Sequence, residues 1–234
     1  MLYVPFSTAK EYIIGVEDVQ YYPLFDFRGH DTSRPSFTKD LLAHFFESEN
    51  LAYRFVALPI KRFDKWFVEH SIDFKFPDNF RWREDSANSL GIHFSDPVLK
   101  LTAGTYVLKK NQNVDRKSIS TLATIRGFYP TLWINEVKKK QVVLYEEALP
   151  IAIVKQIIYG YSDATNIDAN VLRHYLKKVN NTDELVLAKN IHSEQYHYHF
   201  STIYYPEIIE KFNQYLKNNQ DYIAKLKAKY NIQE

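Results

Sequence analysis

The sequence predicts an α/β protein in which two lobes, each a mixed sheet flanked by helices, enclose a cleft. Segments with strand-like and helix-like patterns alternate along most of the chain. A polar stretch after residue 109 interrupts this alternation, and a second alternating set follows it. The chain has 234 residues, which suffice for two lobes of about 100 residues each. We therefore expect a lobe boundary near residue 105.

The first lobe is predicted from apolar runs with two different periods. Short runs bounded by polar residues indicate buried strands, and apolar residues at helical spacing indicate helices. Ser36 is the expected N-cap of the first helix. The expected strands are residues 11–18, 53–58 and 72–76, and the expected helices are residues 36–49 and 60–70. An irregular segment, residues 77–90, precedes extended residues 91–94.

The second lobe repeats the pattern. Its expected strands are residues 105–109, 122–125, 142–145 and 163–167, and its expected helices are residues 130–140, 149–159 and 169–178. Two further strands, residues 184–189 and 195–200, precede one long terminal helix over residues 206–230. Pro206 suits the first turn of that helix.

Composition excludes several classes of function. Thirty basic and 28 acidic residues give a net charge of +2, which argues against nucleic acid as a partner. The absence of cysteine excludes disulfides and thiolate catalysis. Phosphate-loop, dinucleotide and nucleophile-elbow patterns are lacking, so no cofactor is expected. No apolar run is long enough to insert in a membrane, and no export signal is visible at the amino terminus.

Four segments resemble the periplasmic solute-binding proteins for polar amino acids, bacterial extracellular solute-binding protein family 3. The segments are GVEDVQYYPLFDF (residues 15–27), YRFVALPIKRFDKWFVEHSIDF (53–74), IHFSDPVLKLTAGTYVLKK (92–110) and YGYSDATNIDANVLRHYL (159–176). YYPEIIEKFNQYLK (204–217) is similar to the family's closing helix. The order and spacing of these segments, more than any single motif, carry the resemblance to a divergent member.

The resemblance implies a two-lobed, periplasmic-binding-protein-like type II fold with two hinge crossings. One lobe would comprise residues 1–105 plus 193–234, and the other residues 106–192. A small polar or aromatic, amino-acid-like solute would be captured in the cleft by hinge closure. The implied partner is an ABC permease or a sensor protein, and the implied location is the periplasm, with a signal peptide removed. We expect a monomer without enzymatic activity.

Four candidate ligand contacts follow from the family's pattern. Asp168 falls where the family places the carboxylate that pairs with the ligand's ammonium group, and Asn166 just before it would face the same mouth. Tyr21 lies on the aromatic turn that stacks on the ligand, and Glu17 ends the preceding strand. Helix capping is the alternative role for Asp168, and core packing is the alternative for Tyr21.

The carboxylate grip of the family is altered in this sequence. Asn88 stands where Thr or Ser followed by an Arg is expected. Arg81 or Arg83 would substitute as the bidentate cation, with Lys75 a third candidate, and solvated loop arginines are the alternative. Phe76 and Asp78, which lie between the strand and these arginines, are also counted as ligand contacts.

The second lobe departs from the family in the segment RGFYP, residues 126–130. Gly127 is retained, but Phe128 and Tyr129 replace small hydroxyl residues that donate to an anionic group. Arg126 adds a candidate cation at the mouth. These changes predict a smaller or more apolar pocket, lined in part by the many aromatic residues, which make up 16% of the chain.

Three alternatives remain open at this level. An enzyme on the same fold, such as a dehydratase or lytic glycosidase, would use cleft carboxylates among Glu17, Asp78 and Asp168. A metal site would use His197 and His199 on one face of the last expected strand, together with His192 before it. A ligand-sensing input protein for signalling would share the binding mode but not the transporter.

Overall fold

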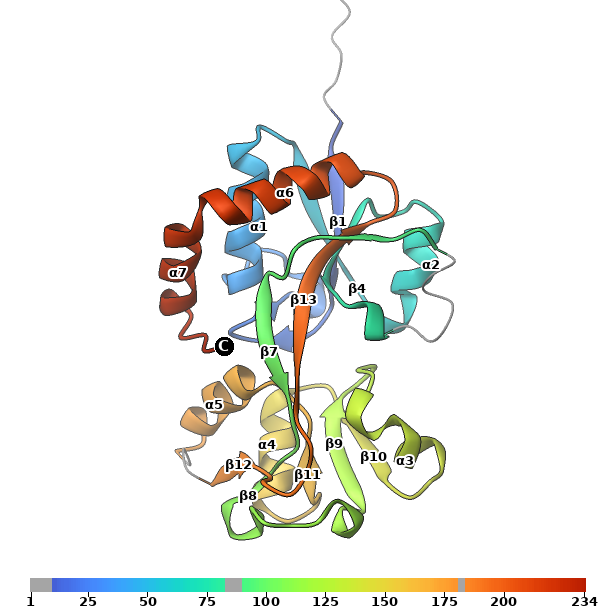
Figure 1. Cartoon of the computed structure of the whole chain (residues 1–234), viewed down its shortest axis with the longest axis vertical. Helices are drawn as coiled ribbons and strands as arrows, with labels where there is room; N and C mark the ends of the chain where they lie inside the picture. Colours follow the sequence, from blue (N-terminus) through green and yellow to red (C-terminus); the bar gives the residue numbers. More distant parts are fainter. Residues whose placement is uncertain (1–9, 83–89, 181–183) are drawn as a thin grey trace, which may run out of the picture.

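The structure, a computed structural model, describes residues 10–82, 90–180 and 184–234. The two large sheets each contain parallel and antiparallel strand pairs, and helices flank both. Figure 1 shows the two lobes one above the other, with two long strands passing between them. The predicted two-lobed α/β architecture is confirmed.

The first lobe contains a sheet in the order β4-β1-β5-β13-β6, with β7 paired to β13. Its strands are β1 (Tyr12–Glu17), β4 (Tyr53–Leu58), β5 (Phe74–Asp78), β6 (His93–Phe94), β7 (Leu99–Ala103) and β13 (Glu194–Thr202). β4, β1 and β5 run parallel, and β13 runs antiparallel to β5. The three parallel strands therefore end at one edge, which is where α/β proteins commonly place ligands.

The second lobe contains a sheet in the order β10-β9-β11-β8-β12. Its strands are β8 (Tyr106–Leu108), β9 (Thr121–Ile125), β10 (Val143–Glu147), β11 (Ala164–Thr165) and β12 (Leu185–Leu187). β10, β9 and β11 are parallel, and β8 is antiparallel to both β11 and β12. A small hairpin, β2 (Gln20–Tyr21) and β3 (Phe25–Asp26), follows β1.

Seven α-helices flank these sheets in the part of the chain that the structure describes. They are α1 (Phe37–Ser48), α2 (Phe63–Val68), α3 (Ile134–Lys138), α4 (Pro150–Ile158), α5 (Ala169–Lys178), α6 (Pro206–Asn218) and α7 (Gln220–Lys229). Ser36 caps α1 as predicted, with its side chain accepting a hydrogen bond from the Lys39 N–H. The first lobe carries α1, α2, α6 and α7, and the second carries α3, α4 and α5 (Figure 1).

The connection between the lobes is an antiparallel pair of strands. β7 and β13 pair from Leu99 opposite Tyr198 to Ala103 opposite Glu194, and they run side by side toward the second lobe in Figure 1. β8 of the second sheet begins at Tyr106, directly after β7. Residues at the far end of this pair, such as Glu194, therefore lie between the lobes.

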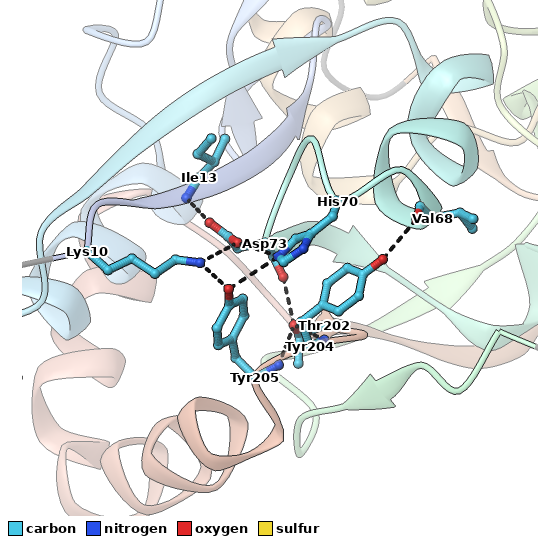
Figure 2. Close-up of polar contacts among 8 residues, drawn as sticks. All are labelled: Lys10, Ile13, Val68, His70, Asp73, Thr202, Tyr204 and Tyr205. Atoms are coloured by element: carbon cyan, nitrogen blue, oxygen red, sulfur yellow. Dashed lines mark hydrogen bonds and ion pairs between the residues drawn. The ribbon is translucent and has the colours of Figure 1, made fainter.

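The beginning of β1 is fixed by a polar cluster around Asp73 (Figure 2). The Asp73 carboxylate accepts a 2.8 Å hydrogen bond from the Ile13 N–H and pairs with Lys10 at 3.0 Å and with His70 at 3.2 Å. His70 stacks on Tyr204, with 3.8 Å between ring centroids. This cluster connects the start of β1 to the segment after β13. It thereby fixes the position of the other end of β1, which reaches the cleft at Glu17.

Two predictions about elements were wrong. The single terminal helix is two helices, because Asn219 leaves the helical conformation with φ −115° and ψ 29°, and its side chain donates to the Tyr215 carbonyl. The second error concerns residues 99–103, which form β7, whereas the strand expected in this part of the chain was residues 105–109. The β2–β3 hairpin was likewise not predicted.

Candidate functional site

A cavity of about 250 Å³ lies between the two lobes, and both contribute to its wall. From the first lobe it receives the end of β1, the short helix Phe80–Trp82 after β5, and the hinge strand β13. From the second lobe it receives the turn after β9 and the end of β11. The cavity is thus formed where strand ends of the two sheets meet.

Six of the eleven predicted contact residues line this cavity together. They are Glu17, Tyr21, Arg81, Gly127, Phe128 and Asn166, and the alternative cation Lys75 lines it as well. Residues predicted from both lobes therefore meet at one cavity. Whether these residues bind a ligand stays a prediction.

Four other predicted residues lie away from the cavity wall. Phe76 is fully buried in the core, because its neighbour in β5, Lys75, takes the side that faces the cleft. Asp78 is also fully buried and supports Lys75 from behind. Arg126 faces a neighbouring cavity, and Asp168 caps α5. Arg83, the remaining predicted contact, lies outside the described residues, as does Asn88.

Glu17 is the most perturbed acid of the cavity. Its side chain is only 3% exposed, and its Oε2 atom has no hydrogen-bond partner among the described residues. Burial raises the pKa of Glu17 to about 8, with the nearby Asp78 adding to the rise and Lys75 opposing it. At neutral pH the Glu17 side chain is therefore largely protonated unless a further cation lies beside it.

Asn166 supplies a second unpartnered acceptor from the opposite lobe. It directly follows β11, and its side-chain oxygen is buried without a hydrogen-bond partner in the described part of the chain. Unsatisfied buried polar atoms are rare in folded proteins and cost about 1–3 kcal/mol each. Glu17 and Asn166 thus leave two unsatisfied polar groups, one from each lobe, in the same cavity, and the Glu17 carboxyl becomes a pure acceptor only when it is ionised.

Two cations of the cavity wall, Lys75 and Arg81, already have partners. The Lys75 ammonium donates to Asp78 at 3.0 Å and lies 5.0 Å from the centroid of the Phe63 ring. The Arg81 guanidinium donates to Glu194 at 2.6 Å. A ligand carboxylate at Arg81 would have to share the guanidinium with Glu194 or displace Glu194. The cation expected to bind the carboxylate of an α-amino acid is therefore already paired.

Aromatic rings form much of the remaining wall. Tyr21 meets Phe128 of the second lobe edge-to-face at 5.0 Å, and Tyr198 lies between Trp82 and Tyr196 at 5.7 and 5.6 Å. Burial raises the pKa of Tyr21, Tyr196 and Tyr198 well above the usual value, so all three remain neutral phenols. The predicted aromatic lining is present in the structure.

Asp168 has the capping role that was the alternative at the sequence level. Its carboxylate accepts a 2.7 Å hydrogen bond from the Asn170 N–H at the start of α5. Burial raises the pKa of Asp168, and the two bonds from Asn170 oppose that rise. The backbone N–H of Asp168, not its carboxylate, reaches the first lobe, where it donates to the Tyr21 oxygen at 2.7 Å.

Sequence reasoning missed the contribution of β13 to the cavity. Glu194, Tyr196 and Tyr198 all line it, and their spacing of two places them on one face of the strand. This alternation was visible in the sequence, but the face toward the cleft could be identified only once β13 was known to cross between the lobes. His197 and His199 lie at alternate positions of the strand, and no group of three or more metal-ligating residues gathers in residues 10–82, 90–180 and 184–234.

Comparison with known proteins identifies the fold. No protein-family model and no curated protein matches the sequence. Solved structures match over nearly the whole chain. The GluR0 ligand-binding core in complex with L-glutamate has a TM-score of 0.72 at 16% identity, covering 96% of this chain and 99% of that one.

Two further matches come from different settings. A mutant of ArgBP from T. maritima has a TM-score of 0.70 at 16% identity, with 94% of each chain covered. The VFT2 domain of Bordetella pertussis BvgS has a TM-score of 0.68 at 14% identity, covering 94% of this chain and 93% of that one. The chain therefore has the two-lobed fold of periplasmic binding proteins. Within its described residues, no helix is both long and apolar enough to span a membrane.

Proposed function

We propose that this protein is a solute-binding protein that captures a small molecule carrying a protonated amine or a similar group of hydrogen-bond donors. The solute is amino-acid-like or aromatic, and it lies in the cavity between a lobe of residues 1–105 plus 193–234 and a lobe of residues 106–192. The fold shared with GluR0 and ArgBP supports this proposal, and the chemistry of the cavity sets the solute class.

The unpartnered acceptors Glu17 and Asn166 carry the proposal. An ammonium group offers three N–H donors, which match two buried acceptors on opposite walls. A cation at this position also favours ionised Glu17, whose charge is unfavourable in the empty cavity. The rings of Tyr21 and Phe128 then enclose the apolar part of the solute.

Contact with both lobes gives the solute a preference for the closed arrangement. A ligand that binds only when both walls are in place shifts the population toward the closed state. The closed state would then be recognised by an ABC permease for uptake or by a sensor protein, in the periplasm. Because the fold is similar both to ArgBP and to a BvgS domain, we propose the ABC permease and the sensor protein as two alternative partners.

A binding role is preferred to catalysis because two of the three carboxylates considered for catalysis are engaged structurally and do not line the cavity. Of the three carboxylates considered for catalysis, only Glu17 lines the cavity. Asp78 is paired with Lys75, and Asp168 is occupied as a helix cap. Recovery of the bound solute chemically unchanged after prolonged incubation is the expected result.

The test is a thermal-shift screen of primary amines, amino acids and aromatic amines, followed by calorimetric titration of each hit. A solute at a hundred times its Kd should add about 2.7 kcal/mol to the free energy of unfolding. Glu17→Gln should weaken binding at least tenfold, whereas Glu210→Gln, on the exposed face of α6, should leave it unchanged. Equal binding by both variants would refute the proposed role of Glu17.

A further inference from the structure

A second cavity, of about 500 Å³, lies beside the solute cavity and also joins the two lobes. The two cavities share three wall residues, Ile60, Lys61 and Gly127. A Cβ atom built on Gly127 would lie 3.3 Å from the Ile60 Cβ, so these residues already touch closely and separate the two spaces. The second cavity is a solvent-exposed part of the interlobe cleft, which we call the second chamber.

Three cations converge on this second cavity. Arg28 and Lys61 follow β3 and β4 of the first lobe, and Arg126 directly follows β9 of the second. None of their side-chain nitrogens has a hydrogen-bond or ion-pair partner among the described residues. Like charges facing one space repel each other, so these exposed cations of the two lobes oppose lobe closure, less strongly than buried charges would because solvent screens them.

Among the described residues, the one acidic residue on this wall, Asp18, already interacts with the turn at Gly29 and His30. Asp18 accepts a 2.6 Å hydrogen bond from the Gly29 N–H through Oδ1, and its Oδ2 lies 3.7 Å from His30 Nε2. With three cations and this one carboxylate on the wall, an excess of two positive charges remains. The cavity is therefore suited to a ligand with at least two negative charges.

We infer that this chamber binds a small multivalent anion that carries carboxylate or phosphate groups, and that the bound anion favours closure of the lobes. Two guanidinium groups provide planar pairs of N–H donors that match carboxylate and phosphate oxygens. Because the cations come from both lobes, a bound anion replaces repulsion across the cleft with attraction. This site lies beyond the proposed solute site and does not depend on the identity of the solute.

Coupling between the two chambers follows from their shared wall. An anion and a solute that both favour the closed state each raise the affinity of the other, by the same factor. The anion would act as an effector of solute capture. Direct anion binding can nevertheless be measured without any solute.

The experiment titrates citrate and pyrophosphate into the full-length protein by calorimetry, at constant ionic strength set with sodium chloride. The expected result is saturable binding of at least one of these anions, weakened tenfold or more by Arg126→Gln and by Lys61→Gln. Arg62→Gln is the matched control, since Arg62 is an exposed neighbour that does not line the chamber. Circular dichroism establishes that each variant is folded.

Two results would overturn the inference. One is the absence of saturable binding of either anion, and the other is equal binding by Arg126→Gln and Arg62→Gln, which would place the anion elsewhere. Glu17→Gln should still bind the anion, because Glu17 lies in the other chamber. Failure of the anion site is thereby distinguished from failure of the proposed solute site.

Discussion

The backbone N–H of Asp168 in the second lobe donates a 2.7 Å hydrogen bond to the phenolic oxygen of Tyr21 in the first. Both residues are buried, with exposed fractions of 3% and 2%. This hydrogen bond holds the two lobes together beside the solute cavity. Tyr21 therefore combines a structural bond through its oxygen with a ring that lines the cavity.

Replacing Tyr21 with Phe should destabilise the protein. The change leaves the buried Asp168 N–H without a partner, at a cost of about 1–3 kcal/mol in the free energy of unfolding. Urea denaturation followed by circular dichroism measures the change. Tyr145→Phe is the control, because Tyr145 is 43% exposed. A loss no larger than that of the control would show that the interlobe bond contributes nothing to stability.

The raised pKa of Glu17 predicts a pH dependence of stability. Its folded value of about 8 lies above the usual 4.5, so between these values the folded state retains a proton that the unfolded chain has released. The stability contributed by this proton is fully present below pH 4.5 and is lost as pH rises through about 8. The loss amounts to roughly 3–5 kcal/mol for a shift of this size.

Glu17→Gln removes this titration while keeping the shape of the side chain. The variant and the native protein should have similar stability near pH 5, and the variant should become progressively more stable by comparison as pH approaches 9. Other titrating groups contribute equally to both proteins and cancel in the difference. Denaturation midpoints at four pH values provide the measurement, and a difference independent of pH would contradict the burial of an ionisable Glu17.

The overall fold could be predicted because its signals are local. The Ser36 cap and a regular apolar stripe predict helix α1, and short apolar runs predict the parallel strands. Strand β7 was missed because its apolar alternation is short. Only Leu99 and Leu101 mark it, and the segment lies between two stretches that were already expected to be extended. The break at Asn219 was missed because a single residue outside the helical conformation leaves the apolar period of the two helices nearly intact.

The candidate site was predictable where the family's pattern could be matched to residues of this sequence. Glu17 and Gly127 were identified from the resemblance to the family's pattern, and Asn166 from strand alternation next to Asp168. Which side chain of a pair turns to the cavity depends on tertiary contacts, as Lys75 and Asp78 show through their mutual bond. The engagement of Arg81 by Glu194 joins residues 113 positions apart, and no local pattern indicates such a pair.

The Arg81–Glu194 pair predicts that Glu194 limits the binding of carboxylates. Glu194→Gln removes the negative charge that engages Arg81 at 2.6 Å, so the guanidinium becomes available to a ligand. The affinity for solutes that carry both an amine and a carboxylate should rise several-fold relative to amines that lack the carboxylate. Calorimetric titration of one such matched pair of solutes tests this ratio. Glu207→Gln, at the start of α6 away from the cavity, is the control, and an unchanged ratio would contradict the prediction.

The contact between Gly127 and Ile60 predicts that a side chain at residue 127 forces the lobes apart. Gly127 has φ +89° and lies against Ile60, whereas Gly160 has φ +74° and no atom within 4 Å of an added Cβ. Gly127→Val and Gly160→Val thus share the strain of a branched residue at positive φ, but only the first introduces a clash between lobes. Small-angle scattering should show a larger radius of gyration for Gly127→Val alone. Adding Ile60→Ala should reduce the expansion by removing the opposing side chain, and equal radii for the two glycine variants would show that closure does not depend on this contact.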